Sequence, residues 1–207
     1  NISIIDSEIL NNISTHDGGG IWFRQSTGDL DNVIVSSNFA ENTGGGIHVF
    51  DESNIVIKNS NIDDNSANNC GGGIGMTDSS ELVIDSTLIT NNSTEGLDYW
   101  VNGSNGGGLF SLSSEAIITN SIINKNSSFH SGAGLYSWAG SMNISKTLVS
   151  GNLSGDKGGG VYIGENSILD LDKVTIVNND SNMNIESEGF GDGLNSYNSQ
   201  EFIINNS

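Results

Sequence analysis

Short runs along this chain alternate apolar with polar residues, for example Ile2-Ser3-Ile4 and Leu169-Asp170-Leu171. A period of two is typical of β-strands that bury one face and turn the other toward solvent. The runs are brief, and polar corners rich in Asn, Asp, Ser and Gly separate them. The 3.6-residue period of an amphipathic helix does not appear, so the pattern predicts many short strands.

This pattern repeats, and glycines mark its period. Glycine triplets or close variants begin at equivalent points of seven units: Gly18, Gly44, Gly71, Gly106, Gly132, Gly158 and Gly191. The steps between them are 26, 27, 35, 26, 26 and 33 residues. The two long steps predict a standard unit plus an insertion, at residues 93–105 and 180–190. Loops on one side of a repeat protein often carry its binding function.

A second landmark, [IV]-x-x-N-x-[AST], occurs once in each unit. Its asparagines are Asn12, Asn38, Asn65, Asn92, Asn126, Asn152 and Asn179. We expect them to point inward, where each amide can hydrogen-bond the next and form an asparagine ladder. Asn also tolerates the left-handed conformation that a tight corner needs. Their predicted role is structural.

The repeat predicts an all-β fold, a single-stranded right-handed parallel β-helix of about seven coils of about 26 residues. We expect three short strands in each coil, with the glycines at a corner where coils approach closely and positive φ is needed. Residues 1–207 should form one domain. Asn1 and Phe202-Ile203-Ile204 both match the second strand of a coil, so both ends are expected mid-coil, as in a fragment or a filament subunit.

The glycine and asparagine motifs are linked in each unit. The glycine tetrapeptides read GGGI at 18–21, 44–47 and 71–74, GGGL at 106–109, GAGL at 132–135 and GGGV at 158–161. The chain therefore resembles the polymorphic outer-membrane protein repeat family, whose signature pairs a GGAI-like tetrapeptide with FxxN. Ile or Val replaces the family's Phe throughout. The resemblance implies a β-helix displayed extracellularly or at the cell surface, with an adhesive or structural role.

Charge excludes several classes of partner. The formal net charge is −19, with only six Lys and Arg residues. Such a surface repels phosphate backbones and anionic lipid, so we expect no nucleic-acid partner. No apolar run approaches the roughly 18 residues of a membrane span, so this segment should not insert into a membrane. The single cysteine, Cys70, allows no internal disulfide.

Acidic pairs are the candidates for catalysis. They are Asp29/Asp31, Asp63/Asp64 and Asp170/Asp172. A lyase would need Ca²⁺-binding Asp beside a basic residue, and a glycosidase needs paired carboxylates. No basic cluster accompanies these pairs, and His16, His48 and His130 have no metal-ligand spacing. We therefore expect no catalytic residue, no metal site and no cofactor, with adventitious Ca²⁺ the one exception that an acidic surface allows. Polysaccharide binding or cleavage remains the alternative.

Aromatic residues recur on the strand after the glycines. They are Trp22, Phe50, Phe110, Tyr136, Trp138, Tyr162 and Tyr197, and His48 shares their face. The alternation places them outward, so we predict a contiguous exposed patch. Such patches usually mark an interface, here a protein–protein seam or a carbohydrate platform. The other interpretation is that corner loops or a neighbouring domain cover the rings.

Several asparagines lie in N-x-S/T sequons. Those of the ladder should be buried, which leaves Asn102, Asn143 and Asn205 as candidate glycosylation sites. Taken together, the sequence favours a non-catalytic extracellular β-helix with a structural or adhesive role. Its expected partners are other protein chains, through self-association or a larger surface assembly, with glycans as a second class.

Overall fold

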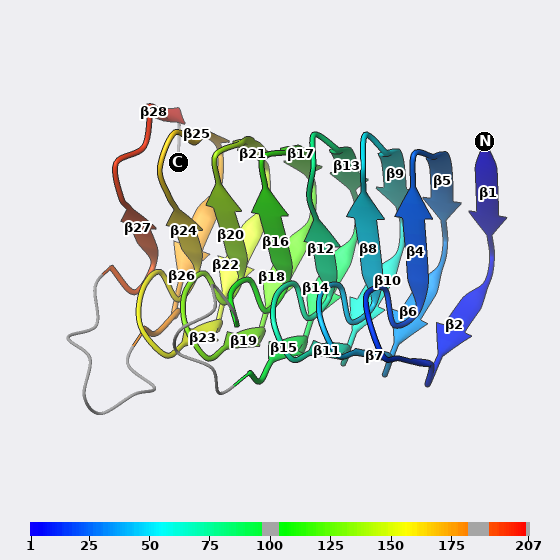
Figure 1. Ribbon diagram of the computed structural model, residues 1–207. Coiled ribbons are helices and arrows are strands. Elements are labelled where there is room, and N and C mark those ends of the chain that lie inside the picture. Colours follow the sequence, from blue (N-terminus) through cyan, green and yellow to red (C-terminus); the bar gives the residue numbers. More distant parts are fainter. Residues whose placement is uncertain (97–103, 182–190, 206–207) are drawn as a thin grey trace.

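The computed structural model describes residues 1–96, 104–181 and 191–205, and within these it is built from parallel strands stacked coil on coil (Figure 1). Each strand pairs in register with the equivalent strand of the next coil, and four parallel sheets result. No helix occurs in these residues, so none could cross a membrane. We call the sheets A to D in the order in which the chain enters them.

The bounds of the strands follow the coil. Sheet A holds β1 (Ile2–Ile5), β5 (Thr27–Asp31), β9 (Asn54–Lys58), β13 (Glu81–Asp85), β17 (Glu115–Thr119), β21 (Ser141–Ser145), β25 (Ile168–Asp172) and β28 (Glu201–Asn205). Sheet B holds β2 (Glu8–Leu10), β6 (Ile34–Ser36), β10 (Asn61–Asp63), β14 (Leu88–Thr90), β18 (Ile122–Asn124), β22 (Leu148–Ser150) and β26 (Thr175–Val177). Sheet C holds β3 (Ile13–Ser14), β7 (Phe39–Ala40), β11 (Ser66–Ala67), β15 (Ser93–Thr94), β19 (Ser127–Ser128) and β23 (Leu153–Ser154). Sheet D holds β4 (Ile21–Arg24), β8 (Ile47–Phe50), β12 (Ile74–Met76), β16 (Leu109–Leu112), β20 (Leu135–Trp138), β24 (Val161–Ile163) and β27 (Leu194–Ser196).

The predicted parallel β-helix is confirmed, with two differences in detail. The described chain makes about six turns rather than seven. A complete coil also has four strands rather than three, because the small residue two positions after each of the first six ladder asparagines belongs to a two-residue strand of sheet C. Two residues are too few to show a period-two pattern, so the sequence could not reveal this strand.

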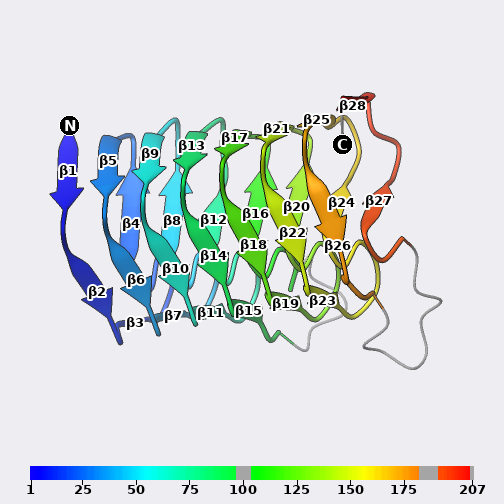
Figure 2. The same cartoon turned by 180° about the vertical axis from the view of Figure 1, so that it is seen from behind.

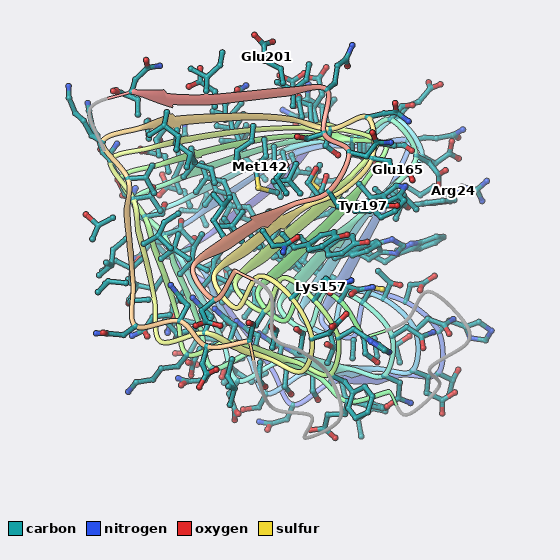
Figure 3. The ribbon with its side chains drawn as sticks, turned by 90° about the vertical axis from the view of Figure 1, so that its left-hand side faces the viewer. Arg24, Met142, Lys157, Glu165, Tyr197 and Glu201 are labelled. Carbon is teal, nitrogen blue, oxygen red and sulfur yellow. The ribbon has the colours of Figure 1, made fainter. Side chains whose placement is uncertain are left out.

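The core runs along the axis of the coil. Inward residues of neighbouring coils stack directly on one another, as Ile62 of β10 does on Ile89 of β14. In the view along the axis, Met142 points into this core, whereas Tyr197 and Arg24 lie on the outer side of sheet D (Figure 3). The inward columns of the middle coils are fully buried, so apolar burial supplies the main stabilisation of the stack.

The asparagine ladder is present at the corner between sheets B and C. The amide Nδ2 of Asn65 donates to Oδ1 of Asn92 (3.0 Å) and to the carbonyl of Val35 in the preceding coil (2.9 Å). The main-chain nitrogen of Asn65 donates to the same Oδ1 (3.0 Å). The equivalent bonds join all seven predicted asparagines, from Asn12 to Asn179. Their structural role is thereby confirmed.

The ladder also explains why the two sequence motifs are linked. A Cβ added to Gly73, the third glycine of its triplet, would lie 2.9 Å from Cγ of Asn92 and 2.7 Å from the carbonyl oxygen of Gly108. The third glycine therefore lets the backbone pack against the amide of a ladder asparagine. The first glycine of each triplet has a positive φ, for example +63° at Gly71. The expected left-handed conformation of the ladder asparagines is wrong, because the residue before them adopts it instead, as at Asn91 (φ 53°).

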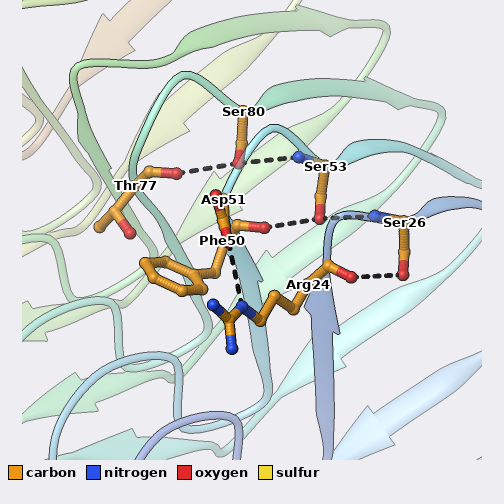
Figure 4. Close-up of polar contacts among 7 residues, drawn as sticks. All are labelled: Arg24, Ser26, Phe50, Asp51, Ser53, Thr77 and Ser80. Atoms are coloured by element: carbon orange, nitrogen blue, oxygen red, sulfur yellow. Dashed lines mark hydrogen bonds and ion pairs between the residues drawn. The ribbon is translucent and has the colours of Figure 1, made fainter.

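Two further polar ladders were not anticipated. At the corner between sheets D and A, the main-chain nitrogen of Ser26 donates to Oγ of Ser53 (3.1 Å), and that of Ser53 to Oγ of Ser80 (3.3 Å) (Figure 4). A similar ladder at the corner between sheets A and B includes Ser60 and Thr87. The signal was available in the sequence, since a Ser stands twelve positions before five of the seven ladder asparagines, and a Ser or Thr stands five positions before five of them.

The two long steps leave the coil undisturbed. Ile74 pairs with Leu109, and Val161 with Leu194, in the same register as coils without extra residues. The extra residues therefore lie between sheet C and the glycine corner, although the first two residues of the predicted insertion 93–105, Ser93 and Thr94, belong to β15 of sheet C. The central parts of the two insertions, residues 97–103 and 182–190, fall outside the described residues.

Candidate functional site

The aromatic residues of sheet D form a stack on its outer surface. The rings of Phe110 and Tyr136 lie 5.2 Å apart and nearly parallel, and those of Tyr136 and Tyr162 lie 5.0 Å apart. The three side chains are only 6–8% exposed, and with Cys70 they form a second apolar cluster outside the coil. The predicted outward direction is correct, but these rings bury one another.

The expectation of one contiguous exposed patch is therefore wrong. His48 is also buried, at 4% exposure, and Phe50 and Trp138 are partly buried. Only Trp22 (51%) and Tyr197 (55%), near opposite ends of the row, are exposed. The physical cause is that rings repeating at the coil spacing stack face to face, while the segments that lead into the glycine corners cover their edges.

Gly75 interrupts the row between His48 and Phe110. A Cβ at this position would collide with the methyl group of Thr43, which occupies the space. On the N-terminal side of this break, Trp22 stacks on Phe50 at 6.4 Å. Arg24 lies over the Phe50 ring and pairs with Asp51 (Nε–Oδ2, 3.0 Å), as Figure 4 shows. The row thus consists of two separate clusters.

His48 is a buried polar side chain with unmet hydrogen-bonding capacity. Neither ring nitrogen has a hydrogen-bond partner among the described residues, and Nδ1 lies 3.8 Å from Oδ2 of Asp17. Burial lowers the pKa of His48, while the charges of Asp17 and Asp78 oppose this shift. The neutral imidazole is therefore favoured, and it packs against the Phe50 ring at 5.7 Å.

A pocket opens beside the second cluster. Its volume is about 200 Å³, and it is lined by Asn105, Phe110, Leu112, Tyr136 and Trp138. The Trp138 indole extends over Gly164, where any side chain would collide with it. Burial raises the pKa of the Tyr136 hydroxyl, which has no hydrogen-bond partner among the described residues. The pocket therefore combines aromatic walls with a phenol hydroxyl and the amide of Asn105.

The remaining sequence candidates lie elsewhere and do not converge. Asp29, Asp31, Asp170 and Asp172 are on the outer face of sheet A. Asp63 accepts hydrogen bonds from Thr90 and Asn91. Within the described residues, no group of three His, Cys, Asp or Glu side chains could hold a metal ion. His16 is exposed, and the His130 ring meets Phe129 edge to face.

The candidate glycosylation sites differ in exposure. Asn143 is partly buried on the outer face of sheet A. Asn205 is exposed and its amide donates to Asp170 (3.5 Å). Asn102 lies outside the described residues. Glycosylation at these positions stays a prediction.

Four stacked parallel sheets around one axial core define the class of parallel β-helices. The chain belongs to the right-handed beta helix region family, whose sequence model matches residues 1–181. No curated protein matches the chain, and no solved structure does. The family occurs in both enzymes and non-enzymes, so membership establishes the fold and not the activity. The narrower resemblance to the polymorphic outer-membrane protein repeats is not established by this match.

Proposed function

We propose that this chain is a non-catalytic adhesive module of an extracellular structure, and that the pocket on sheet D binds one neutral sugar ring of a glycan. The observation that carries the proposal is the pocket formed by Phe110, Leu112, Tyr136, Trp138 and Asn105. It is the place in the described chain where aromatic surface, hydroxyl and amide meet in one concave space. Ligand sites generally combine apolar walls with a few polar groups of this kind.

The size of the pocket limits the ligand. Pockets for drug-sized molecules span roughly 300–1,000 Å³, whereas this one has about 200 Å³. A single six-membered ring fits that space, and a buried oligosaccharide chain does not. The C–H face of the sugar would lie on the Trp138 indole, and the Tyr136 hydroxyl would hydrogen-bond one of its hydroxyl groups. The Oδ1 of Asn105 already accepts from the main-chain nitrogen of Ser131 (3.0 Å), so Asn105 would act as a polar wall of the pocket.

Charge favours a neutral ring over an acidic one. The net charge of −19 repels uronic and sialic acids at long range. Acidic groups also stand close to the aromatic cluster, since Asp156 and Glu165 both act on Tyr162. We therefore place the ligand among neutral hexoses. Extracellular display and association with other protein chains belong to the same proposal, and the family resemblance of the repeats supports them.

Titration with a panel of neutral mono- and disaccharides, followed by calorimetry and tryptophan fluorescence, tests this. Trp138→Ala should weaken binding at least about tenfold, because it removes the stacking surface of the pocket. Trp22→Ala is the matched control, since Trp22 is exposed on the same sheet but lies outside the pocket. Tyr136→Phe keeps the ring and removes the hydroxyl, and should cost about two- to tenfold.

Two outcomes would contradict the proposal. Equal loss of binding in the Trp22 and Trp138 variants would show that the pocket is not the site. Release of new reducing ends or unsaturated sugars from a polysaccharide panel would show that the chain is an enzyme, which is the alternative function of this fold.

A further inference from the structure

Sheet B presents a row of exposed aliphatic side chains that nothing covers among the described residues. Ile34 is 38% exposed, Leu88 42% and Ile122 37%. Asn61 stands between Ile34 and Leu88 in this column, and the half-buried Leu148 follows Ile122. The strands beneath are parallel and in register, and they lie side by side along the coil (Figure 2). Contiguous exposed apolar surface of this kind usually marks an interface.

This face also carries few charges: Glu8 and Asp63 are the charged residues at the outward positions of its strands. From β14 to β26 its outward residues are all uncharged: Leu88, Thr90, Ile122, Asn124, Leu148, Ser150, Thr175 and Val177. The neighbouring sheet A carries most of the strand-borne acidic charge on its outer face: Asp29, Asp31, Glu81, Asp85, Glu115, Asp170, Asp172 and Glu201. Two molecules of charge −19 can therefore approach more easily through sheet B than through sheet A.

The charges that border sheet B are arranged in opposite halves. The acidic residues on this face and its two flanking corners lie in the first three coils: Asp6, Glu8, Asp63 and Asp64. The lysines of the same corners lie in the last three coils: Lys125, Lys146 and Lys173. All three lysines are exposed, as are Asp6 and Asp64. One end of the face is thus acidic at its border and the other end is basic.

We propose that sheet B pairs face to face with sheet B of a second copy of this chain, with the two helix axes antiparallel. A twofold axis through β14, the middle strand of the seven, brings Leu88 against its own copy. Counting strands outward from β14, the same axis sets Lys125 opposite Asp64 and Lys173 opposite Asp6. A parallel pairing would instead set Lys125 opposite Asn120 and Lys173 opposite Asn178, so neither lysine would meet a carboxylate.

A second copy fits this surface better than another partner. Only a sheet with the same strand spacing, about 4.8 Å, lets rows of side chains interdigitate along the whole length. A basic partner would be drawn to the acidic outer face of sheet A rather than to a neutral one. The aliphatic column then supplies the affinity, and the border charges fix the orientation.

The size of the face sets the strength of the dimer. Six strand spacings give about 29 Å, and five residues including both corners give about 17 Å, so each copy contributes about 500 Å². That lies at the low end of specific interfaces, where weak and transient complexes are found, so we expect a dissociation constant in the micromolar range. This surface is separate from the sheet D pocket, so the inference does not depend on sugar binding.

Sedimentation equilibrium of the whole chain from about 1 to 500 μM, a range that brackets micromolar dissociation constants, tests the proposal. The wild type should associate to a dimer, and Ile122→Lys should weaken association at least about tenfold. Ile117→Lys is the matched control. It changes the same residue type in the same coil at nearly the same exposure, 36% against 37%, but on sheet A.

Two further variants test the geometry. Leu88→Cys should form a disulfide-linked dimer under mild oxidation, whereas Ile117→Cys should not; Cys70 is buried and present in both. Lys125→Asp should weaken the dimer, and adding Asp64→Lys should restore it, because both opposed pairs are then reversed together.

A wild type that stays monomeric throughout would overturn the proposal. So would equal effects of the two lysine substitutions, or equal crosslinking of the two cysteine variants, because the copies would then meet through another surface. Failure of the charge exchange to restore association would overturn the antiparallel orientation.

Discussion

Replacing Asn92 with alanine should destabilise the β-helix more than any exposed substitution. Asn92 is fully buried in the middle of the ladder. Its Oδ1 accepts from the main-chain nitrogen and from Nδ2 of Asn65, each at 3.0 Å. Its Nδ2 donates to the carbonyl of Ile62 (2.9 Å) and to Oδ1 of Asn126 (3.0 Å). Alanine removes all four of these bonds and leaves the partners buried.

The magnitude follows from those partners. The main-chain N–H of Asn65 is left as a buried donor without an acceptor, which costs about 1–3 kcal/mol. The three other bonds contribute about 0.5–1.5 kcal/mol each. Asn65 Nδ2 keeps its bond to the Val35 carbonyl, and Asn126 Oδ1 keeps its bond from the main-chain nitrogen of residue 92. The free-energy cost of losing their other bonds therefore falls at the lower end of this range. The expected loss is about 4 kcal/mol, a large fraction of the roughly 5–15 kcal/mol that holds a domain folded.

Asn12→Ala is the matched control. Asn12 occupies the same corner in the first coil but is exposed, and its side chain makes one ladder bond, from Nδ2 to Oδ1 of Asn38. Water can replace that bond, so the loss should stay below about 1 kcal/mol. Urea unfolding followed by circular dichroism gives both values, and amide hydrogen exchange at Asn65 and Asn126 shows where protection is lost. Losses that agree within about 1 kcal/mol would refute the reasoning that buried amide partners make the ladder costly to break.

Two other predictions follow from the corners. Gly73→Ala should lower the free energy of unfolding in urea by at least about 2 kcal/mol, because its Cβ would press on Asn92 and on the Gly108 carbonyl. Gly28→Ala should lower it less, because the nearest contact of its Cβ would be 3.2 Å. Equal losses of stability would show that the coils separate freely. His48→Phe should flatten the pH dependence of stability. Because the pKa of His48 is lowered below 6.5 in the folded state, the unfolded chain binds the extra proton, and the wild type loses stability as pH falls below about 6.5. If the free energy of unfolding changed by the same amount in both proteins between pH 8 and pH 5, the result would contradict this prediction.

The sequence was sufficient to predict the coil, but it was insufficient to predict which outward side chains are exposed. A ladder residue such as Asn65 repeats at a fixed spacing, and its role depends only on its equivalents in adjacent coils. Burial of Phe110 or His48 depends instead on ring packing and on the path of the segment before the next glycines, which no period encodes. The alternation predicted their outward direction correctly and their exposure wrongly.

The same contrast holds for the two proposed sites. The pocket requires the Trp138 indole to lie over Gly164, a side-chain conformation that spacing alone cannot predict. The opposite charges at the two ends of sheet B become visible only when corner residues such as Asp64 and Lys125 are assigned to the same border of this sheet. In the sequence, Lys125 is one member of a polar stretch, and Asp64 stands out only as half of a candidate acidic pair.

At the corner between sheet C and the glycine triplet, residues can be added to the chain without changing the geometry of the coil. Steps of 35 and 33 residues close there with the same pairing as steps of 26. Doubling a flexible loop costs only about 0.6 kcal/mol in closure entropy. Mutation can therefore lengthen, shorten or replace segments at this corner without altering a core residue. New recognition surfaces can evolve, or be grafted by design, on a coil whose own sequence stays fixed.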